Sequence, residues 1–321
     1  MHSFAQLVEL FEEKLSKQLL FPETPATLYE PCRYFLDLGG KRVRPVLCLM
    51  GNELFGDINP DAWHAAAGVE LFHNFTLVHD DIMDKAPLRR GQPTLHERNG
   101  LTAGILCGDV MNIFAYDQLA RIRHFLPQVL HLFNKTSIEV CEGQQMDMDF
   151  ESRNDVSLEE YIEMITLKTS VLLACSLKMG ALLGGATEGN ANRLYEFGKN
   201  LGIAFQLQDD YLDAFGTEAK VGKQQGGDIL ANKKTFLLLH AITHADGDAS
   251  RSIRQLLDSD KDGKVGQMLQ LYRDTGADLV CREAVRSYSD KAFECLEDVA
   301  VISKRKDPLK ELATFLLQRD S

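Results

Sequence analysis

The sequence offers little that would support a secreted or membrane-embedded protein. Its seven cysteines are odd in number, scattered between Cys32 and Cys295, and include no CxxC pair, so neither a disulfide framework nor a zinc site is indicated. The amino terminus lacks the basic, apolar and small-residue order of a signal peptide. No apolar run is expected to span a membrane, because Lys178 interrupts the best candidate at 171–186. We therefore expect a cytoplasmic protein.

An excess of positive charge is also missing. The 321 residues include 35 Lys and Arg against 47 Asp and Glu, which gives a formal net charge of −12. A general nucleic-acid binder needs a basic face to meet the phosphate backbone, so the charge argues against this class. A small anionic ligand remains compatible, because the local clusters Lys41-Arg42-Val43-Arg44 and Arg89-Arg90 can bind one.

Alternating strands and linkers rich in Gly, Pro or Ser are absent too, and helical periodicity dominates. The pattern predicts a helix that starts near Phe4 and ends before 22–25, one from Pro45 to Gly56, one from Pro60 through Asp84, and others at roughly 101–121, 127–148, 158–184, 190–215 and 230–244, with several pieces after 250. A capping box is expected at Ser157-Leu-Glu-Glu160. We predict a single all-α domain over residues 1–321.

Two short stretches crowd carboxylates at the ends of apolar segments. They read LVHDDIMD, which ends at Asp84, and FQLQDDYLD, which ends at Asp213. On a helix, Asp80 and Asp84 are four residues apart and share one face. Asp209 and Asp213 are related in the same way. Like charges at this spacing repel each other, and at a helix C-terminus they also oppose the macrodipole. Each stretch therefore needs a positive partner.

A divalent cation is the partner that we favour for both stretches. Magnesium is often held by one or two carboxylates while substrate phosphates supply its other ligands. A solvated helix end would explain one isolated acidic run. Two nearly matching runs, each after an apolar helix and in a chain with separate basic groups, favour a pair of carboxylate clusters that clamp a magnesium diphosphate.

The residues around these stretches resemble the trans-polyprenyl diphosphate synthases. Matching blocks occur in that family's order from residue 39 to 235, whereas the segment after about 245 matches only loosely. The blocks are Gly39-Gly-Lys-Arg-Val-Arg-Pro45, Glu70-Leu-Phe-His73, Asp80 to Asp84 with Arg89-Arg-Gly-Gln-Pro93, Gly108-Asp109, Gly143-Gln144 with Asp147, Lys168-Thr169, Phe205-Gln206 with Asp209 to Asp213, Gly222-Lys223, and Gly227-Asp228 leading to Lys233-Lys-Thr235.

The resemblance implies an isoprenoid-synthase helical bundle around a deep central cavity, and a homodimer. An allylic diphosphate would bind between the two motifs through magnesium, with three ions per active site. The metal ligands would be Asp80, Asp84 and Asp209, supported by Asp81, Asp210 and Asp213. The allylic substrate would ionise, the double bond of isopentenyl diphosphate would attack the cation, and proton loss to the departing pyrophosphate would complete the reaction.

Anion contacts follow from the same resemblance. The residues that match the isopentenyl diphosphate site are Lys41, Arg44, His73 and Arg90, and those around the allylic diphosphate are Arg89, Lys168, Lys223 and Lys233. Thr169 and Gln206 would add neutral hydrogen bonds. Arginine can pair two phosphate oxygens through its planar fork, whereas lysine acts as a point charge.

The expected product follows from residues that precede the first motif. Phe75 and Thr76 stand five and four residues before Asp80, where aromatic side chains form a floor that limits chain length in the family. An aromatic residue at this point is similar to short-chain enzymes. We expect farnesyl or geranylgeranyl diphosphate, and favour the twenty-carbon product because Thr76 is small and the first motif lacks a two-residue insertion.

Other signals are weaker. The stretch 258–263 resembles the start of an EF-hand loop, but Leu269 stands where the loop needs a glutamate. Glu70-Leu-Phe-His73 is the only ExxH spacing, while di-iron bundles need two. A class I terpene cyclase would lack the isopentenyl site formed by Lys41, Arg44 and Arg90. A non-catalytic regulatory subunit of a prenyltransferase would have degraded aspartate motifs, and both motifs are intact here.

Overall fold

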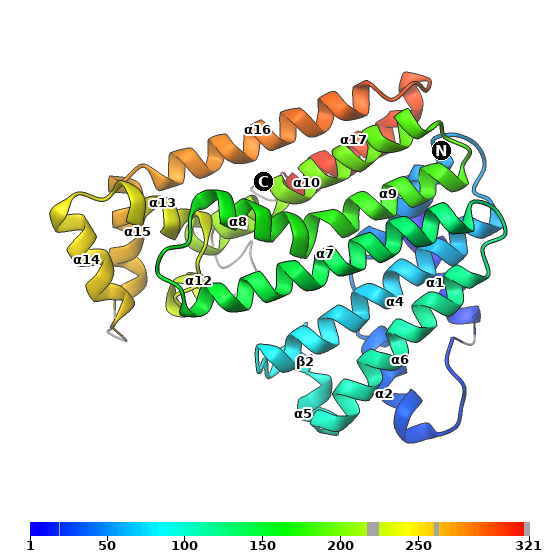
Figure 1. Cartoon of the computed structure of the whole chain (residues 1–321), viewed down its shortest axis with the longest axis horizontal. Coiled ribbons are helices and arrows are strands. Elements are labelled where there is room, and N and C mark those ends of the chain that lie inside the picture. Colours follow the sequence, from blue (N-terminus) through cyan, green and yellow to red (C-terminus); the bar gives the residue numbers. More distant parts are fainter. Residues whose placement is uncertain (19, 217–224, 260–262, 318–321) are drawn as a thin grey trace. The chain divides into compact units, whose positions relative to one another are not determined.

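The computed structural model describes residues 1–18, 20–216, 225–259 and 263–317, and its regular structure is almost wholly helical (Figure 1). The all-α prediction is therefore confirmed. The chain divides into two compact units. The first contains Met1–Phe133, Cys175–Leu194 and Ala300–Leu309, and the second contains Asn134–Ala174, Tyr195–Val299 and Lys310–Ser321. The single domain over 1–321 stays a prediction.

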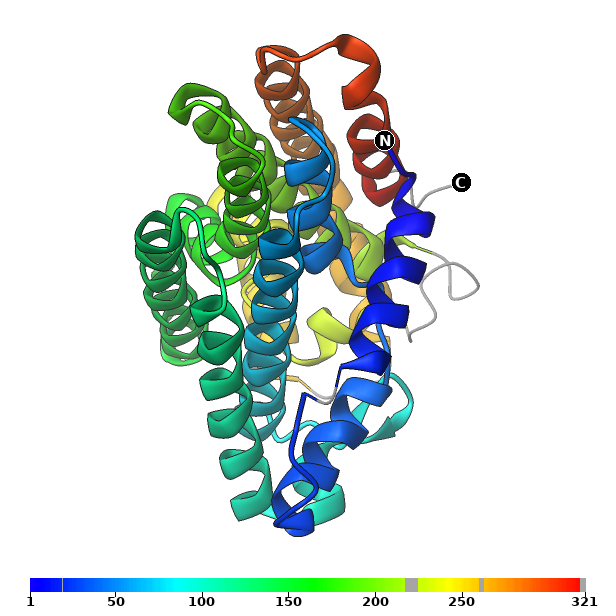
Figure 2. The ribbon, with the colours of Figure 1, turned by 90° about the vertical axis from the view of Figure 1, so that its right-hand side faces the viewer.

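The first unit is built around one long helix, α4. The α-helices that lie wholly within this unit are α1 (Phe4–Lys17), α2 (Ala26–Asp37), α3 (Val43–Glu53), α4 (Pro60–Met83), α5 (Leu95–Asn99) and α6 (Leu101–Ala120). α4 packs along α6 and against α3 (Figure 2). A small antiparallel hairpin, β1 (Leu88–Arg89) and β2 (Gln92–Pro93), follows α4. This hairpin was not expected from the sequence.

Local signals in the sequence set the start of α4. The Asn59 side chain accepts a hydrogen bond from the Ala62 amide at 3.0 Å, and Pro60 occupies the first turn. The helix runs to Met83, with Asp84 as its C-cap. The prediction of one helix over 60–84 is therefore confirmed, and the first aspartate motif lies on its last turn.

The remaining helices belong to the second unit or carry residues of both units, except η2, which lies in the first unit. They are α7 (Leu126–Ser152), α8 (Leu158–Ile165), the π-turn η1 (Thr166–Ser170), α9 (Val171–Leu183), α10 (Glu188–Phe215), α12 (Gly227–Leu230), α13 (Phe236–His244), α14 (Gly247–Leu257), α15 (Lys264–Asp274), α16 (Ala277–Glu297), the 3₁₀ helix η2 (Ser303–Lys306) and α17 (Asp307–Leu317). The capping box predicted at Ser157 is present, because Ser157 and Glu160 exchange side-chain to backbone hydrogen bonds at 3.1 and 2.9 Å.

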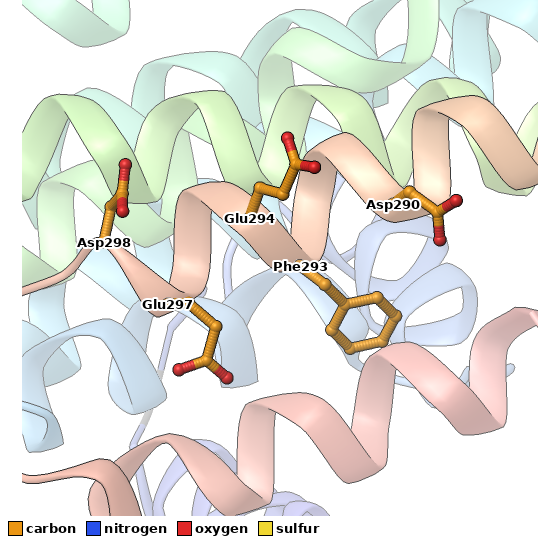
Figure 3. A pocket seen from close by; sticks show the side chains of 5 residues that line it. All are labelled: Asp290, Phe293, Glu294, Glu297 and Asp298. Atoms are coloured by element: carbon orange, nitrogen blue, oxygen red, sulfur yellow. The ribbon is translucent and has the colours of Figure 1, made fainter.

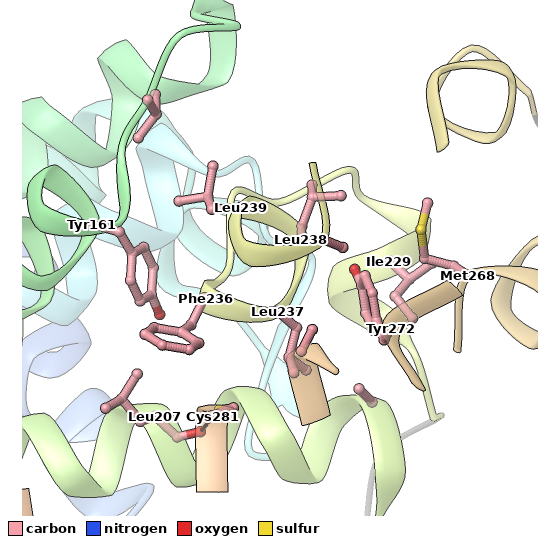
Figure 4. Close-up of a cluster of buried hydrophobic side chains, with 14 of the residues drawn as sticks. Tyr161, Leu207, Ile229, Phe236, Leu237, Leu238, Leu239, Met268, Tyr272 and Cys281 are labelled. Carbon is pink, nitrogen blue, oxygen red and sulfur yellow. Dashed lines mark hydrogen bonds between the residues drawn. The ribbon is translucent and has the colours of Figure 1, made fainter. Parts of the chain in front are cut away.

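The core of the second unit surrounds α13. Successive residues of this helix, from Phe236 to Leu239, are all buried. They pack among buried side chains of other elements, including Tyr161, Leu207 and Tyr272 (Figure 4). A helix that is apolar on every face is a buried one. The run Phe236-Leu-Leu-Leu therefore fixes α13 inside this unit.

Two expected helices are interrupted. The segment predicted as one helix at 230–244 is α12 and α13, because Asn232 adopts a left-handed conformation (φ 54°) and Thr235 then caps a new helix through a bond from the Leu238 amide. The segment predicted at 158–184 contains η1 between α8 and α9. Propensity alone gives no signal for a π-turn of this kind.

The amino-terminal region also differs from the prediction. α2 was missed, since Pro25 at its start and Pro31 inside it obscure its periodicity. The next helix begins at Val43 rather than at Pro45, with Arg42 as its N-cap in the left-handed region (φ 50°). The short helix α5 was not predicted either.

One stretch, Leu158–Leu183, is long and apolar enough to cross a membrane by length and composition alone. It includes most of the run at 171–186 that sequence analysis named as the best candidate, and the expectation that no run spans a membrane stays a prediction. About two-thirds (67%) of its most apolar window is buried within the protein, and a core helix passes the same test. This is weak evidence for a span.

Candidate functional site

The first aspartate motif divides its carboxylates between two environments. Asp80 is partly exposed and Asp84 is exposed, while Asp81 is only 2% exposed. Arg89 holds Asp81 in a bidentate pair, with Nε to Oδ2 and Nη2 to Oδ1 both at 2.7 Å. This pair fixes the β1–β2 hairpin to the last turn of α4. Two residues that were predicted for different roles, Asp81 and Arg89, are therefore in contact.

Basic groups collect beside α4 in the same unit. Arg44 donates from Nη1 to the Nε2 atom of His73 at 3.0 Å, and its own Nε atom is buried without a hydrogen-bond partner. The guanidinium of Arg90 lies against Gly40, where an added Cβ would be 2.8 Å from Nη2. Lys41 is exposed and directly follows this glycine. The structure therefore places Arg44 beside His73, and Arg90 beside the glycine that precedes Lys41.

The charge states of this basic group follow from burial. Burial lowers the pKa of Arg44 to about 10, although the carboxylate of Glu70 raises it. Burial, with the positive charge of Arg44 next in effect, holds the pKa of His73 well below its ordinary value. His73 is therefore neutral at pH 7, and its Nε2 atom can accept from Arg44. The group is a set of cations around one neutral imidazole, which suits an anion.

Glu70 and Arg42 form a buried ion pair below this group. Their side chains are 6% and 4% exposed, and Arg42 bonds to the Glu70 carboxylate, to the Leu36 carbonyl at 3.0 Å and to Glu12 at 2.7 Å. The pair joins α1, α2 and α4 at the N-cap of α3. The ExxH spacing therefore does not form a metal centre, since Glu70 faces Arg42 while His73 faces Arg44.

The second aspartate motif lies at the end of α10, in the second unit. Asp210 is 3% exposed and accepts from the Tyr161 hydroxyl, from Gln206 Nε2 at 3.3 Å and from the Phe236 amide at 3.4 Å. Burial raises the pKa of Asp210 to about 7, against the lowering effect of the Tyr161 hydrogen bond. Asp209 and Asp213 are partly exposed, and Asp213 accepts from the Asp228 amide at 3.0 Å.

Two predicted lysines of the second unit also have acidic partners. Lys168 lies in the π-turn η1, and its ammonium bonds to Asp147 of α7 at 2.6 Å. Lys233 lies 3.9 Å from Asp228. Thr169 follows Lys168 in the π-turn, which is a type of turn often found at functional sites. Lys223, which was predicted for the allylic site, lies outside the described residues.

The predicted chain-length residues lie on α4 in a stack of rings. The Phe75 ring lies between those of Phe72, at 5.5 Å between centroids, and His79, at 4.9 Å. The stack continues from Phe72 to Phe133 at 5.2 Å. Thr76 bonds to the carbonyl of His73 within its own helix at 2.8 Å. Phe75 is thus held from both sides along the helix.

Three observations concern residues that the sequence reading did not assign. Tyr161 was missed, because nothing in the sequence links it to Asp210, 49 residues away.

An open pocket of about 450 Å³ on α16 is lined by Asp290, Phe293, Glu294, Glu297 and Asp298 (Figure 3), and contains no predicted site residue. The middle of the EF-hand-like stretch, 260–262, lies outside the described residues.

The donor set is compatible with magnesium. The predicted ligands Asp80, Asp84 and Asp209 supply only carboxylate oxygens, which hard cations prefer. The middle aspartate of each motif, Asp81 or Asp210, is held by protein groups. Within the described ranges, no group of three His, Cys, Asp or Glu side chains is placed to hold a metal. A magnesium ion would take its other ligands from phosphate or water.

Comparisons with known proteins agree with these features. A family model described as polyprenyl synthetase matches residues 25–275. The chain is 44% identical over 227 residues to a geranylgeranyl diphosphate synthase of Methanosarcina mazei, with 70% of each chain covered. It is 34% identical over 337 residues to a geranylfarnesyl diphosphate synthase of Natronomonas pharaonis, with 99% of this chain and 97% of the other covered.

A solved structure agrees as well. The crystal structure of a geranylgeranyl pyrophosphate synthase superposes with a TM-score of 0.93 at 42% identity, covering 100% of both chains. The family model spans most of the chain, including both aspartate motifs and the basic group beside α4. The chain therefore belongs to the polyprenyl synthetase family, and it is a prenyltransferase.

Proposed function

We propose that this chain is a short-chain trans-prenyltransferase that condenses an allylic diphosphate with isopentenyl diphosphate. The observation that carries the proposal is the basic group of Lys41, Arg44, His73 and Arg90 beside the helix that bears the first aspartate motif. A terpene cyclase binds one diphosphate substrate and does not need a second anion site. A non-catalytic subunit does not bind catalytic magnesium and does not need intact aspartate motifs.

The proposed roles follow the two anion sites. Magnesium, held by Asp80, Asp84 and Asp209 with three ions per active site, would stabilise the charge of the departing pyrophosphate. The group beside α4 binds isopentenyl diphosphate and orients its double bond. The allylic diphosphate is bound by Lys168, Lys233, Arg89 and Lys223. Thr169 and Gln206 donate hydrogen bonds to the same substrate.

The protein also has to keep water from the reacting carbon. The buried residues of α4 before the motif include an apolar run from Ala65 to Val69 and the pair Leu71 and Phe72, and a tail slot along this helix would exclude water from the allylic cation. The proton lost at the end goes to pyrophosphate, so no side-chain base is required. Asp81 and Asp210 support the site by holding Arg89 and Tyr161.

The product is proposed to be geranylgeranyl diphosphate, with farnesyl diphosphate as the alternative. Phe75 would form the floor of the tail slot. We expect Phe75→Ala to lengthen the product by at least one five-carbon unit, because the change removes the ring that lies between Phe72 and His79. Mass spectrometry of the products measures this. Phe75→Tyr is the matched control, since it keeps a ring between Phe72 and His79.

The proposed function has a direct test. Purified protein is incubated with dimethylallyl and isopentenyl diphosphates, with and without magnesium, and the products are identified by mass spectrometry. A magnesium-dependent twenty- or fifteen-carbon diphosphate supports the proposal. Absence of any elongation would contradict it, and conversion of longer allylic diphosphates to hydrocarbons would favour a cyclase.

We further propose that the enzyme is a homodimer of single-domain chains. An exposed apolar row on α6 supports the dimer, and its members Leu101, Ile105, Leu106, Ile113 and Tyr116 are 38–65% exposed. Rows of this kind mark interaction surfaces. Light scattering should give twice the mass of the 36.0 kDa chain, and a monomer mass at micromolar concentration would exclude the dimer. A cytoplasmic location is supported by seven free cysteines.

A further inference from the structure

One block of the family pattern, Gly108-Asp109, has no part in the mechanism above. Gly108 lies on α6, opposite the end of α4. A Cβ atom at this position would lie 2.2 Å from Nε2 and 2.4 Å from Cδ2 of His79. Real Cβ atoms do not approach other atoms so closely. The absence of a side chain at Gly108 therefore gives the His79 ring its place against α6.

His79 is fixed in that place on two further sides. Its Nε2 atom donates a hydrogen bond to the Ile105 carbonyl of α6 at 3.2 Å, so the tautomer carries its proton on Nε2. Its ring meets the Phe75 ring at 4.9 Å between centroids, with an interplanar angle of 72°. Edge-to-face contacts of this kind are favourable and directional. The imidazole is thus a wedge between Gly108 and Phe75.

The other side of Phe75 is fixed by the protein core. Phe72, on the preceding turn of α4, is 2% exposed and lies 5.5 Å from Phe75 between centroids. It packs in turn on Phe133, which lies on α7 and is fully buried. Phe72 cannot move without disturbing this core. His79, the other ring in contact with Phe75, has a side chain that is 26% exposed and is less enclosed than Phe72.

We propose that Gly108 and His79 are positioning residues that set the length of the prenyl product by holding the Phe75 ring. The inference rests on the proposed function, in which Phe75 is the floor of the tail slot. His79 touches neither substrate nor product in this role. It fills the space into which the Phe75 ring would otherwise turn, and Gly108 keeps that space open for the imidazole.

A neighbouring glycine provides a matched control. Gly104 lies one turn before Gly108 on α6, and its added Cβ would be 2.9 Å from Cδ1 of Ile82, with no atom of His79 among its near contacts. Gly104→Ala therefore crowds the same pair of helices without touching the imidazole. If Gly108 acts only in helix packing, both glycine variants should change the product distribution to a similar extent. If Gly108 acts by making room for His79, only Gly108→Ala should lengthen the product.

The test measures product distribution in six proteins: the wild type, Gly108→Ala, His79→Ala, the double variant, His79→Phe and Gly104→Ala. We expect His79→Ala to raise the ratio of longer to normal product at least fivefold. Gly108→Ala should raise it less, because the new methyl group refills part of the space. The rate of the first condensation, from five to ten carbons, should stay within about threefold of wild type in all variants, since the wedge acts on later steps.

The combined variants separate the wedge from a general loss of packing. If Gly108 acts through His79, then Gly108→Ala adds no further lengthening in the His79→Ala background. His79→Phe keeps a ring against Phe75 and should restore the wild-type distribution. Equal distributions in wild type and Gly108→Ala, or the same lengthening in Gly104→Ala and Gly108→Ala, would overturn the inference.

A crystal structure of Gly108→Ala decides the question independently of activity. A displaced His79 ring with a turned Phe75 ring supports the wedge, and an unmoved Phe75 ring contradicts it. If the wild type makes no prenyl product at all, the proposed function fails, yet the coupling of these three side chains is still judged from that structure. The two failures are therefore distinguishable.

Discussion

Replacement of Asp80 or Asp209 by alanine is expected to lower kcat by roughly 10²–10³-fold, the loss typical when one group that stabilises developing charge is removed. Each change removes a carboxylate of the proposed magnesium site, from α4 in one case and from α10 in the other. Steady-state rates with dimethylallyl and isopentenyl diphosphates measure the effect over a magnesium titration. Asp80→Asn, which keeps the shape of the side chain, should lose nearly as much as Asp80→Ala.

The matched control for these variants is Asp117→Ala. Asp117 is an exposed carboxylate on α6 that accepts from Arg121 at 2.7 Å. Its loss should leave turnover within about twofold of wild type, because exposed pairs contribute little. Turnover near wild type in both Asp80→Ala and Asp209→Ala would rule out a metal clamp built from the two motifs.

The second large effect is expected on stability. Arg42→Ala should lower the free energy of unfolding by about 3–5 kcal/mol, because it leaves the Glu70 carboxylate buried without its cation. The change also removes the bond to the Leu36 carbonyl. Urea unfolding, followed by circular dichroism, measures the difference. Arg121→Ala, which breaks an exposed pair, should cost less than about 1 kcal/mol.

A double variant separates the charge from the packing. Arg42→Met with Glu70→Leu replaces both ions by apolar groups, so neither ion of the pair is left buried without the other. It should unfold at a higher urea concentration than Arg42→Ala alone. If the double variant is no more stable than the single one, the pair contributes through shape rather than through charge.

The helices that could be predicted from the sequence are those whose ends are marked by residues close to them in the chain. The start of α4 was predictable because Asn59 and Pro60 are strong helix-start residues. The positions of the two aspartate motifs near the ends of α4 and α10 were predictable because each follows an apolar run, whereas their role in metal binding stays a prediction. α2 was not predictable, since Pro31 lies inside it. The break before α13 depends on a left-handed Asn232, which the apolar run on its own does not reveal.

The parts of the site that escaped prediction depend on contacts between distant residues. Arg42 belongs to a cluster of basic residues in the sequence, and only the fold shows that it turns inward to Glu70 while Arg44 turns to His73. Tyr161 carries no motif, yet it donates to the buried Asp210. Such pairings are set by packing, so a pattern along one chain cannot supply them.

The π-turn Thr166–Ser170 places one extra residue in a stretch that would otherwise be a continuous α-helix. Each residue of an α-helix advances the chain by about 100° around the axis, so removing one residue from the turn would rotate everything before it by that angle relative to everything after it. Lys168 would then no longer face Asp147. The backbone of Lys168 approaches α7 so closely that a side chain at Gly143 could not be accommodated, and this close contact between the two segments would also be lost. Length in this segment is therefore under tighter constraint than residue identity.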